Sequence, residues 1–256
     1  MKEYQFIQIE KKNDRTDVVL NRPPVNVLNI AMMRELCDAF TSLADEANLK
    51  VVVLRAEGKA FSAGVDVSEH TAEKVNEMIT VFGDLFKTLF AIKAVTIAAV
   101  KGAALGGGCE LAIGCDIVLA SEKAKFGQPE VKVGVLPPIA AVLFPKLVGR
   151  NRAIEWLLSG KAYPAVEAEH IGLINAVYPF DLFDQKVDEF AAEFTSCSAK
   201  VLAITKDLLN RLLPLGVSEG AALADEIYLN QLMKTEDAHE GLAAFLEKRQ
   251  PVWKNK

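Results

Sequence analysis

Apolar and polar residues in the first half of the chain follow two different periods. Val51–Ala56 and Val95–Val100 are short, mostly apolar runs, a pattern typical of strands buried on both faces. Ala31–Ala47 and Val75–Phe90 instead repeat apolar residues at helical spacing, and Asn29 stands where a helix cap is expected. Further strands are expected at Phe6–Glu10, Asp17–Asn21 and near Asp116–Ala120, the first two as a hairpin. This alternation of strands and helices predicts an α/β fold.

From about Pro138 onward the pattern is mostly helical, with one further strand expected at Leu173–Tyr178. The expected helices are Ile139–Val148, Arg152–Leu158, Leu182–Phe194, Val201–Leu213, Ser218–Met233 and Asp237–Lys248. The last of them carry many apolar residues, although little sheet remains for them to cover. We therefore expect them to pack against a neighbouring subunit.

Composition and charge narrow the class of protein. The 256 residues are 51% hydrophobic and 25% charged, as in a soluble globular protein with a large core. The net charge of −5 argues against a nucleic-acid partner, which requires a concentrated basic surface. Four cysteines without CxxC spacing and only three histidines argue against a metal site. Without a signal-like start or an apolar stretch long enough to span a bilayer, we expect a cytoplasmic protein with no membrane contact.

Two glycine-containing loops follow buried strands and are candidates for ligand binding. Gly106, Gly107 and Gly108 stand between a strand and a helix-like segment, and Phe61–Asp66 follows the strand at Val51–Ala56. Glycine allows the backbone to approach a ligand closely, and free N–H groups favour developing negative charge. Taken alone the signal is weak, because three consecutive glycines are more often a tight turn and the second loop resembles many ordinary turns. Neither matches the P-loop or the dinucleotide-binding pattern.

Glu110 and Glu130 are the candidate acid–base residues. Each stands in apolar or turn-forming sequence, GGGCELAIG and FGQPEVKVG, and glutamate is seldom buried without a partner or a purpose. Two carboxylates in one water-poor pocket push their pKa values apart, which gives one base and one acid at neutral pH. The spacing alone leaves open a second interpretation, in which both are unrelated surface glutamates.

A longer stretch decides between these interpretations. Lys93–Glu130, KAVTIAAVKGAALGGGCELAIGCDIVLASEKAKFGQPE, resembles the signature region of the enoyl-CoA hydratase/isomerase (crotonase) superfamily. The resemblance extends from Asn21-Arg22-Pro23 through the FSAGVD loop to Glu247-Lys248-Arg249. It implies an α/β spiral of ββα units in two roughly perpendicular sheets over residues 1–195. It also implies a helical trimerisation region over residues 196–256, in a homotrimer or a dimer of trimers.

The resemblance implies roles for the catalytic residues. Two backbone N–H groups, on Val65 and Gly107, would form an oxyanion hole for the thioester oxygen, each worth roughly 3–4 kcal/mol. Glu110 and Glu130 would position and activate a water molecule, with Glu110 expected as the base and Glu130 as the proton donor. Because the pair titrates together, this division of labour stays open. Two carboxylates favour hydration over double-bond isomerisation.

The resemblance also implies how coenzyme A is held. Contacts are expected from Ala63, Asp66 and Val67 in the oxyanion loop. Phe245 and Lys248 near the C-terminus are expected to reach the nucleotide across a subunit boundary. Coenzyme A enters as part of the substrate, so no separate cofactor and no metal are expected. His70 lies near the oxyanion loop and could line the entrance to the site, although an ordinary loop histidine is the preferred interpretation.

Two positions depart from the pattern of straight-chain hydratases. Pro137–Val142 replaces a proline followed by a small, glycine-rich turn, which predicts a reshaped acyl pocket and a substrate other than a plain short enoyl chain. Pro24 replaces a common lysine, which puts one nucleotide contact in doubt.

The segments FGQPEVKVGVLPPIAAVLFPKLVG and DEIYLNQLMKTEDAHEGLAAFLEKR are most similar to cyclohexa-1,5-diene-1-carbonyl-CoA hydratases of anaerobic benzoyl-CoA degradation. The implied reaction adds water to the conjugated ring diene and gives 6-hydroxycyclohex-1-ene-1-carbonyl-CoA. The alternatives are a short-chain enoyl-CoA hydratase of fatty acid β-oxidation and an enoyl-CoA isomerase. A non-catalytic member that binds coenzyme A or a macromolecule is disfavoured by the two glutamates.

Overall fold

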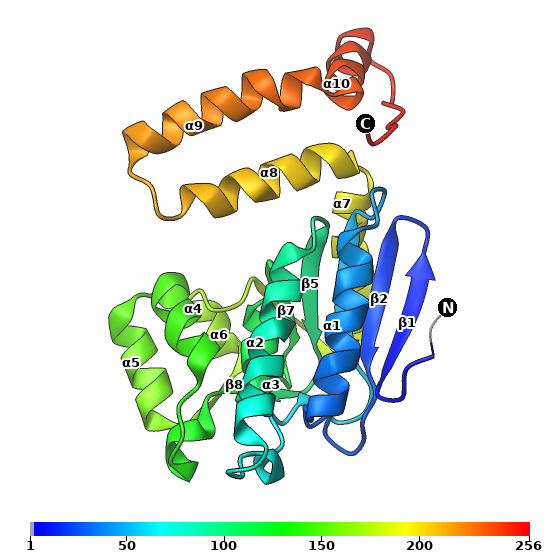
Figure 1. The fold of residues 1–256 in the computed structure, drawn as a ribbon. Coiled ribbons are helices and arrows are strands. Elements are labelled where there is room, and N and C mark those ends of the chain that lie inside the picture. The colour runs from blue at the N-terminus through cyan, green and yellow to red at the C-terminus, as the bar shows by residue number, and fades with distance from the viewer. Residues whose placement is uncertain (1–2) are drawn as a thin grey trace.

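The computed structural model describes residues 3–256 and has a six-stranded sheet at its centre (Figure 1). The strands follow the order β1-β2-β3-β5-β7-β10 across the sheet. They are β1 (Ile7–Lys12), β2 (Arg15–Leu20), β3 (Val51–Ala56), β5 (Val95–Val100), β7 (Ile117–Ser121) and β10 (Ala176–Tyr178). Only the β1–β2 hairpin is antiparallel, and every other pair in this sheet is parallel. The hairpin and the buried strands are therefore where the sequence predicted them, within a few residues.

A second, four-stranded sheet was not predicted from the sequence. Its strands are β4 (Ala60–Ser62), β6 (Ala103–Leu105), β8 (Lys125–Gly127) and β9 (Ala162–Pro164), in that order. Strands β4, β6 and β8 are parallel to one another, and each follows directly on a strand of the first sheet. Two consecutive strands followed by a helix then repeat along the chain. This repeat confirms the expected spiral of ββα units.

Ten helices surround and extend these sheets within residues 3–256. They are α1 (Ile30–Ala44), α2 (Val75–Ala91), α3 (Gly107–Ile113), α4 (Pro138–Val148), α5 (Arg150–Ser159), α6 (Ala165–His170), α7 (Phe183–Thr195), α8 (Ala199–Leu212), α9 (Val217–Asn230) and α10 (Glu236–Glu247). Asn29 caps α1 as expected, because its side-chain oxygen accepts a hydrogen bond from the Met32 N–H at 3.0 Å. The helix expected at Ser218–Met233 is shorter, since α9 ends at Asn230 and a 3-10 turn follows at Leu232–Lys234.

Both faces of the large sheet are covered, which explains the unbroken apolar runs. In β3, Val52 and Leu54 belong to the main core, whereas Val51 and Val53 belong to a second cluster on the opposite face. Helices α1 and α2 contribute to the main core, and α7 packs on the second cluster through residues such as Val187. A strand with helices on both faces buries every side chain, so its sequence loses the polar alternation of a half-exposed strand.

The last three helices lie beyond the end of the large sheet (Figure 1), where α8 and α9 run side by side and α10 lies near the C-terminus. They keep large apolar side chains in solvent, among them Leu213 at 78% and Phe245 at 82% exposure. Helix α7 ends at Thr195 and α8 begins at Ala199, close to the boundary expected between the two regions. The division into two domains and the trimer stay predictions. None of the helices in residues 3–256 combines the length and the apolar character needed to cross a membrane.

Candidate active site

A cavity of about 240 Å³ lies where the loops after β4, β6 and β8 meet. The parallel arrangement explains this, because the carboxyl ends of parallel strands share one edge of a sheet. Its walls are mostly apolar and contain two carboxylates and one histidine. They are formed by Ala63, Gly64, Val65, Val67, His70, Met78, Ile79, Phe82, Gly106, Gly107, Glu110, Pro129, Glu130, Val133, Val135, Leu136 and Pro138.

The glycine cluster lets three segments approach one another at this cavity. Gly106 has a φ of +51°, and a Cβ built on it would lie 2.7 Å from Oε1 of Glu130. A Cβ on Gly107 would lie 2.6 Å from the Val65 side chain, and one on Gly108 would lie 2.5 Å from Ser62. Real Cβ atoms do not approach so closely. Packing around the carboxylate and the neighbouring loop therefore requires glycine at these positions. The sequence analysis expected glycine here because it lets the backbone approach closely.

Two backbone amides at the cavity have no hydrogen-bond acceptor in residues 3–256. Gly107 is the first residue of α3, so its N–H has no partner inside the helix. Val65 follows β4, and the residues beside it are fixed by hydrogen bonds with Leu28, which donates to Gly64 at 2.8 Å and accepts from Asp66 at 3.0 Å. The Val65 N–H itself donates to no group in these residues. Both amides remain available to a ligand oxygen in the cavity.

Glu110 is buried in α3, with only 1% of its surface exposed. Its Oε1 atom accepts hydrogen bonds from the N–H groups of Ile139 and Ala140, both at 2.7 Å, at the start of α4. Burial raises the pKa of Glu110 to about 8; the charge of Glu130 adds to this rise, and the two N–H groups oppose it. Within residues 3–256 no cation contacts this carboxylate. A pKa near 8 favours its protonated form at neutral pH.

Glu130 lies in the 3-10 segment Pro129–Val133 and faces the same cavity. With its side-chain amide nitrogen turned toward Glu130, the buried Gln128 donates to both carboxylate oxygens at 3.1 Å. Burial raises the pKa of Glu130, and a backbone hydrogen bond partly opposes the rise. The site thus contains two carboxyl groups whose pKa values both lie above the ordinary range.

The structure brings most of the residues expected from the sequence to this one cavity. Those that line it are Ala63, Val65, Val67, Gly107, Glu110 and Glu130. Asp66 instead caps a 3-10 turn by accepting the Ser68 N–H at 3.1 Å, and it lies 3.6 Å from Arg22. Phe245 and Lys248, at the end of α10, are with the C-terminal helices and do not line this cavity in the single chain. Their expected contacts across a subunit boundary stay a prediction.

Other groups at the site were not assigned to it from the sequence. His70, for which an ordinary loop position was preferred over a place at the entrance, lines the cavity, and its Nδ1 lies 3.2 Å from the Asp66 carbonyl oxygen. Met78, Ile79 and Phe82 of α2 form an apolar wall. Helical spacing identified this face of α2 as apolar but could not show that part of it borders a cavity. In residues 3–256 no cluster of three or more metal-ligating side chains occurs.

Comparisons with known proteins agree with this geometry. Residues 10–256 match the family model described as enoyl-CoA hydratase/isomerase. A relative named probable enoyl-CoA hydratase echA8, from Mycobacterium tuberculosis, is 37% identical over 253 residues, covering 97% of each chain. The 2,3-dehydroadipyl-CoA hydratase of Escherichia coli is 34% identical over 245 residues, covering 93% of this chain and 94% of that one. A crystal structure of enoyl-CoA hydratase from Bacillus anthracis superposes with a TM-score of 0.93 at 31% identity, covering 98% of this chain and 100% of that one.

Proposed function

The chain belongs to the enoyl-CoA hydratase/isomerase family, and we propose that, as a hydro-lyase of this family, it hydrates a conjugated cyclic dienoyl-CoA thioester. The enzyme has the enoyl-CoA hydratase activity of the superfamily. The specific substrate we propose is cyclohexa-1,5-diene-1-carbonyl-CoA, and the product is 6-hydroxycyclohex-1-ene-1-carbonyl-CoA. The protein would perform this step of anaerobic aromatic degradation in the cytoplasm, as a homotrimer or a dimer of trimers.

One observation carries the hydratase mechanism. Two carboxyl groups with raised pKa values and two unpartnered backbone amides border one mostly apolar cavity. We infer that the thioester oxygen accepts hydrogen bonds from the N–H groups of Val65 and Gly107. When oxygen attacks the β-carbon, negative charge moves onto the thioester oxygen, and each amide would stabilise that charge by roughly 3 kcal/mol.

The two glutamates would manage the water molecule and its protons. One carboxylate accepts a proton from the water as its oxygen bonds to the β-carbon, and the other carboxyl group donates a proton to the far end of the dienolate. The net change is one added water, with the hydroxyl on the β-carbon and one ring double bond retained. The high pKa of Glu110 favours a proton on Glu110, which is the opposite of the expected assignment of Glu110 as the base. Because the charge of Glu130 contributes to this rise, we leave open which of the two carboxyl groups acts as the base.

The acyl pocket supports a substrate other than a short straight chain. Pro138 lines the cavity at the start of α4, next to the Ile139 and Ala140 amides that hold Glu110. Of the segment Pro137–Val142, only Pro138 lines the cavity, so in residues 3–256 it is the one bulkier side chain that this departure from the family pattern places there. A flat, apolar ring suits walls made of Phe82, Leu136 and their neighbours.

Coenzyme A would be held at the mouth of the cavity. We propose contacts from Ala63, Asp66 and Val67, of which Ala63 and Val67 line the cavity. Val67 is 69% exposed, as expected of a residue at an opening. Phe245 and Lys248 of a neighbouring subunit would add an apolar surface and a positive charge for a phosphate group.

A second candidate is a short-chain enoyl-CoA hydratase acting on straight acyl groups. It is favoured by the names of the relatives, which describe enoyl-CoA and 2,3-dehydroadipyl-CoA hydratases. An enoyl-CoA isomerase is less well supported, because the cavity contains both carboxyl groups that hydration uses.

Parallel assays on the two thioesters test the proposal. We expect kcat/KM for cyclohexa-1,5-diene-1-carbonyl-CoA to exceed that for crotonyl-CoA by at least about 100-fold, since a pocket shaped for a ring places a short chain poorly. Product analysis in water labelled with ¹⁸O and deuterium should find oxygen on the β-carbon and deuterium at the far end of the former diene. Faster turnover of crotonyl-CoA would establish the second candidate instead.

A further inference from the structure

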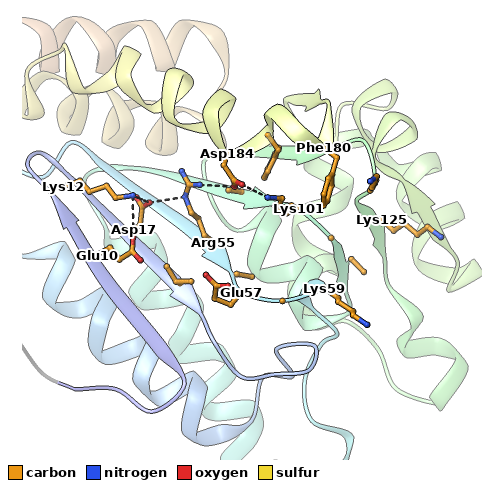
Figure 2. A pocket seen from close by; sticks show the side chains of 18 residues that line it. Glu10, Lys12, Asp17, Arg55, Glu57, Lys59, Lys101, Lys125, Phe180 and Asp184 are labelled. Atoms are coloured by element: carbon orange, nitrogen blue, oxygen red, sulfur yellow. Dashed lines mark hydrogen bonds and ion pairs between the residues drawn. The ribbon is translucent and has the colours of Figure 1, made fainter.

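A second cavity, of about 880 Å³, lies at the opposite end of the small sheet from the candidate active site. Figure 2 shows the side chains that line it. The residues at the beginnings of β4, β6 and β8 border this second cavity, among them Lys59, Ala103 and Lys125. The residues after the ends of the same strands border the catalytic cavity. The two cavities share no lining residue, so the second one is separate from the hydratase site.

Positive charge gathers at this second cavity although the chain as a whole is acidic. Its walls contain six cationic and four anionic side chains, whereas the whole sequence has 29 lysines and arginines against 34 aspartates and glutamates. The cationic residues are Lys12, Arg55, Lys59, Lys101, Lys123 and Lys125, and the anionic ones are Glu10, Asp17, Glu57 and Asp184. The net charge of the cavity wall is thus positive although that of the whole chain is negative, which favours an anionic ligand.

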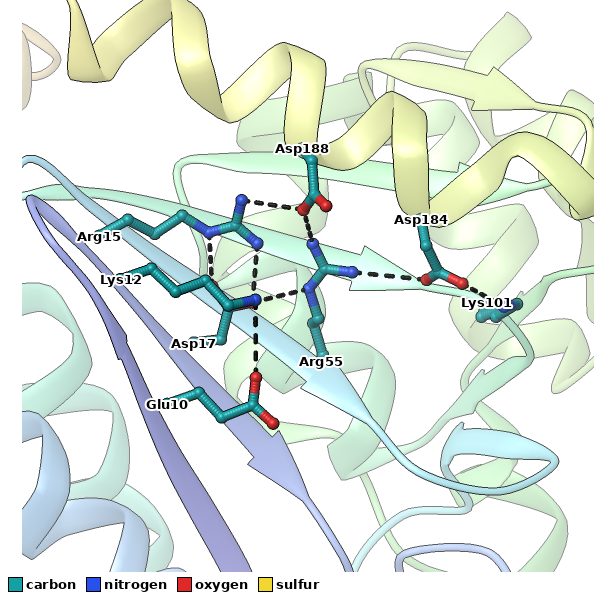
Figure 3. A network of polar contacts seen from close by, with 8 residues as sticks. All are labelled: Glu10, Lys12, Arg15, Asp17, Arg55, Lys101, Asp184 and Asp188. Atoms are coloured by element: carbon teal, nitrogen blue, oxygen red, sulfur yellow. Dashed lines mark hydrogen bonds and ion pairs between the residues drawn. The ribbon is translucent and has the colours of Figure 1, made fainter.

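The charges on one side of the cavity neutralise one another. Arg55 pairs with Asp17 at 3.1 Å and with Asp184 at 3.4 Å, and Asp184 also pairs with Lys101. Figure 3 shows these side chains as one connected network between the large sheet and α7, which includes Arg15, Asp188, Lys12 and Glu10. Three of the four carboxylates of the cavity wall are thus already paired.

The remaining lysines have no such partners. In residues 3–256, Lys59, Lys123 and Lys125 are exposed and have no carboxylate within about 4 Å, the usual limit for an ion pair. Figure 2 shows Lys59 and Lys125 away from the connected side chains around Arg55. Glu57 is the only carboxylate of the cavity wall that forms no ion pair in the described residues. This side of the cavity therefore has an excess of uncompensated positive charge.

An aromatic ring holds two of the ammonium groups in place. The Nζ of Lys123 lies 4.0 Å from the centre of the Phe180 ring, and that of Lys101 lies 5.2 Å from it. The ring attracts cations through its negative face without neutralising their charge. Phe180 thus orders these lysines at the cavity wall, which reduces the loss of side-chain entropy when an anion binds.

We propose that this cavity, bordered by Lys59, Lys101, Lys123, Lys125 and Phe180, binds a small molecule with two or more linked phosphate groups. Lysine ammonium groups bind phosphate as compact point charges. Three unpaired lysines on different strands and turns suit a ligand that carries several negative charges better than they suit a ligand with a single carboxylate. The concave shape favours a small molecule over an extended polyanion, which the acidic surface as a whole would repel.

Calorimetric titration of the full-length protein with inorganic pyrophosphate tests the proposal. We expect one pyrophosphate to bind per chain, with a higher affinity than inorganic phosphate. The affinity for pyrophosphate should fall as the salt concentration rises. Lys123→Glu should weaken binding at least about tenfold, because it replaces an attracting charge by a repelling one. Lys93→Glu is the matched control: Lys93 is exposed and precedes β5, at the end of that strand away from Lys101, and it should leave binding unchanged.

Three results would overturn the proposal. The first is no binding of pyrophosphate at low salt, and the second is equal affinity for phosphate and pyrophosphate. The third is a loss of binding in Lys248→Glu but not in Lys123→Glu, because pyrophosphate would then occupy the site expected for the phosphates of coenzyme A. Hydratase activity of Lys123→Glu, measured in parallel, shows that the variant folds, since Lys123 is outside the catalytic cavity.

Discussion

Two buried acidic residues in this protein, Glu110 and Asp17, have opposite surroundings. Glu110 is buried without a cation and receives only two backbone N–H groups, and its pKa rises to about 8. Asp17 is fully buried as well, but Arg15 donates two hydrogen bonds to it and Lys12 lies 2.9 Å away. The first carboxyl can hold a proton at neutral pH, whereas the second is surrounded by permanent positive charge.

Glu110 is suited to proton transfer, whereas Asp17 links parts of the structure through its ion pairs. Desolvation alone makes the charged form of a carboxyl costly, so an uncompensated acid becomes a proton carrier. A buried acid that is compensated by arginines instead ties elements together: in Figure 3, Arg15 and Arg55 connect Asp17 of β2 to Asp188 of α7. Burial by itself therefore does not identify a catalytic residue, and the charge of its neighbours must be known too.

The largest expected effect comes from removing the acid–base groups. Glu110→Gln or Glu130→Gln should lower kcat by about 10³-fold or more, because general acid–base catalysis contributes about 10²–10⁴-fold and both groups are needed. Steady-state kinetics on the preferred thioester measures the loss. Glu193→Gln, an exposed position on α7, is the matched control and should keep wild-type activity. Near-wild-type activity in either catalytic variant, with the native circular dichroism spectrum, would exclude the two-glutamate mechanism.

The second effect concerns stability at the network of ion pairs in Figure 3. Asp17→Asn removes the buried charge and leaves the exposed Asp188 as the only carboxylate in residues 3–256 that Arg15 and Arg55 still share, so the free energy of unfolding should fall by about 3 kcal/mol. Urea unfolding monitored by circular dichroism measures it, and kcat at a temperature where the variant is folded should not change. A large loss of kcat with unchanged stability would reverse the distinction between the two acidic groups.

The third effect tests the close approach at the glycine cluster. Gly106→Ala would bring a Cβ to 2.7 Å from Glu130 Oε1 at a φ of +51°, so the carboxylate must move. Because displacements of about 1 Å cost about 100-fold in rate, kcat should fall by that order, with a smaller loss of stability. Gly83→Ala on α2 is the matched control, since nothing lies within 4 Å of its Cβ position and alanine favours a helix. Equal kcat in both variants would contradict the proposed packing.

The pattern of apolar and polar residues predicted those elements whose own residues show how they are buried. The runs at Val51–Ala56 and Val95–Val100 became β3 and β5, because burial on both faces requires apolar residues throughout. Strands β4, β6 and β8 could not be predicted, since three residues are too few to show a period. Their hydrogen bonds to one another hold them in place. The passage of the chain from one sheet to the other depends on the packing of the whole spiral, so it cannot be predicted from a short stretch of sequence.

Most of the residues that meet at the cavity were predicted from the sequence, but their electrostatic surroundings were not. Apolar neighbours indicated a buried Glu110, and resemblance to a family linked it to Glu130 and to the amides. The N–H groups that hold Glu110 come from Ile139 and Ala140, on a different helix, and no local pattern connects them. The same holds for Asp17 and Asp188, which meet the same arginines although they are far apart in the sequence. Partners that only the fold brings together decide which buried acid holds a proton.

The remaining predictions concern the sign of the pH dependence of stability rather than the size of an effect. The folded protein keeps the Glu110 proton up to about pH 8, whereas the unfolded chain releases it near pH 4.3. Stability should therefore fall as pH rises between these values, because the folded state binds more protons there. Glu110→Gln removes this slope, so its free energy of unfolding relative to wild type should rise from pH 5 to pH 8. Urea unfolding at both values measures the change.

For Asp188 we expect the opposite dependence of stability on pH. Burial raises its pKa, but the hydrogen bond from Arg15 and the charge of Arg55 outweigh burial, and the pKa lies below its ordinary value. Its contribution to stability is present above the pKa of the unfolded chain, near pH 3.9, and is lost as pH falls. Asp188→Asn should thus be less stable than wild type at pH 6 and approach it at pH 3, with a modest effect because the side chain is 55% exposed. Slopes of the same sign for both variants would show that neighbouring charge does not distinguish the two acidic groups.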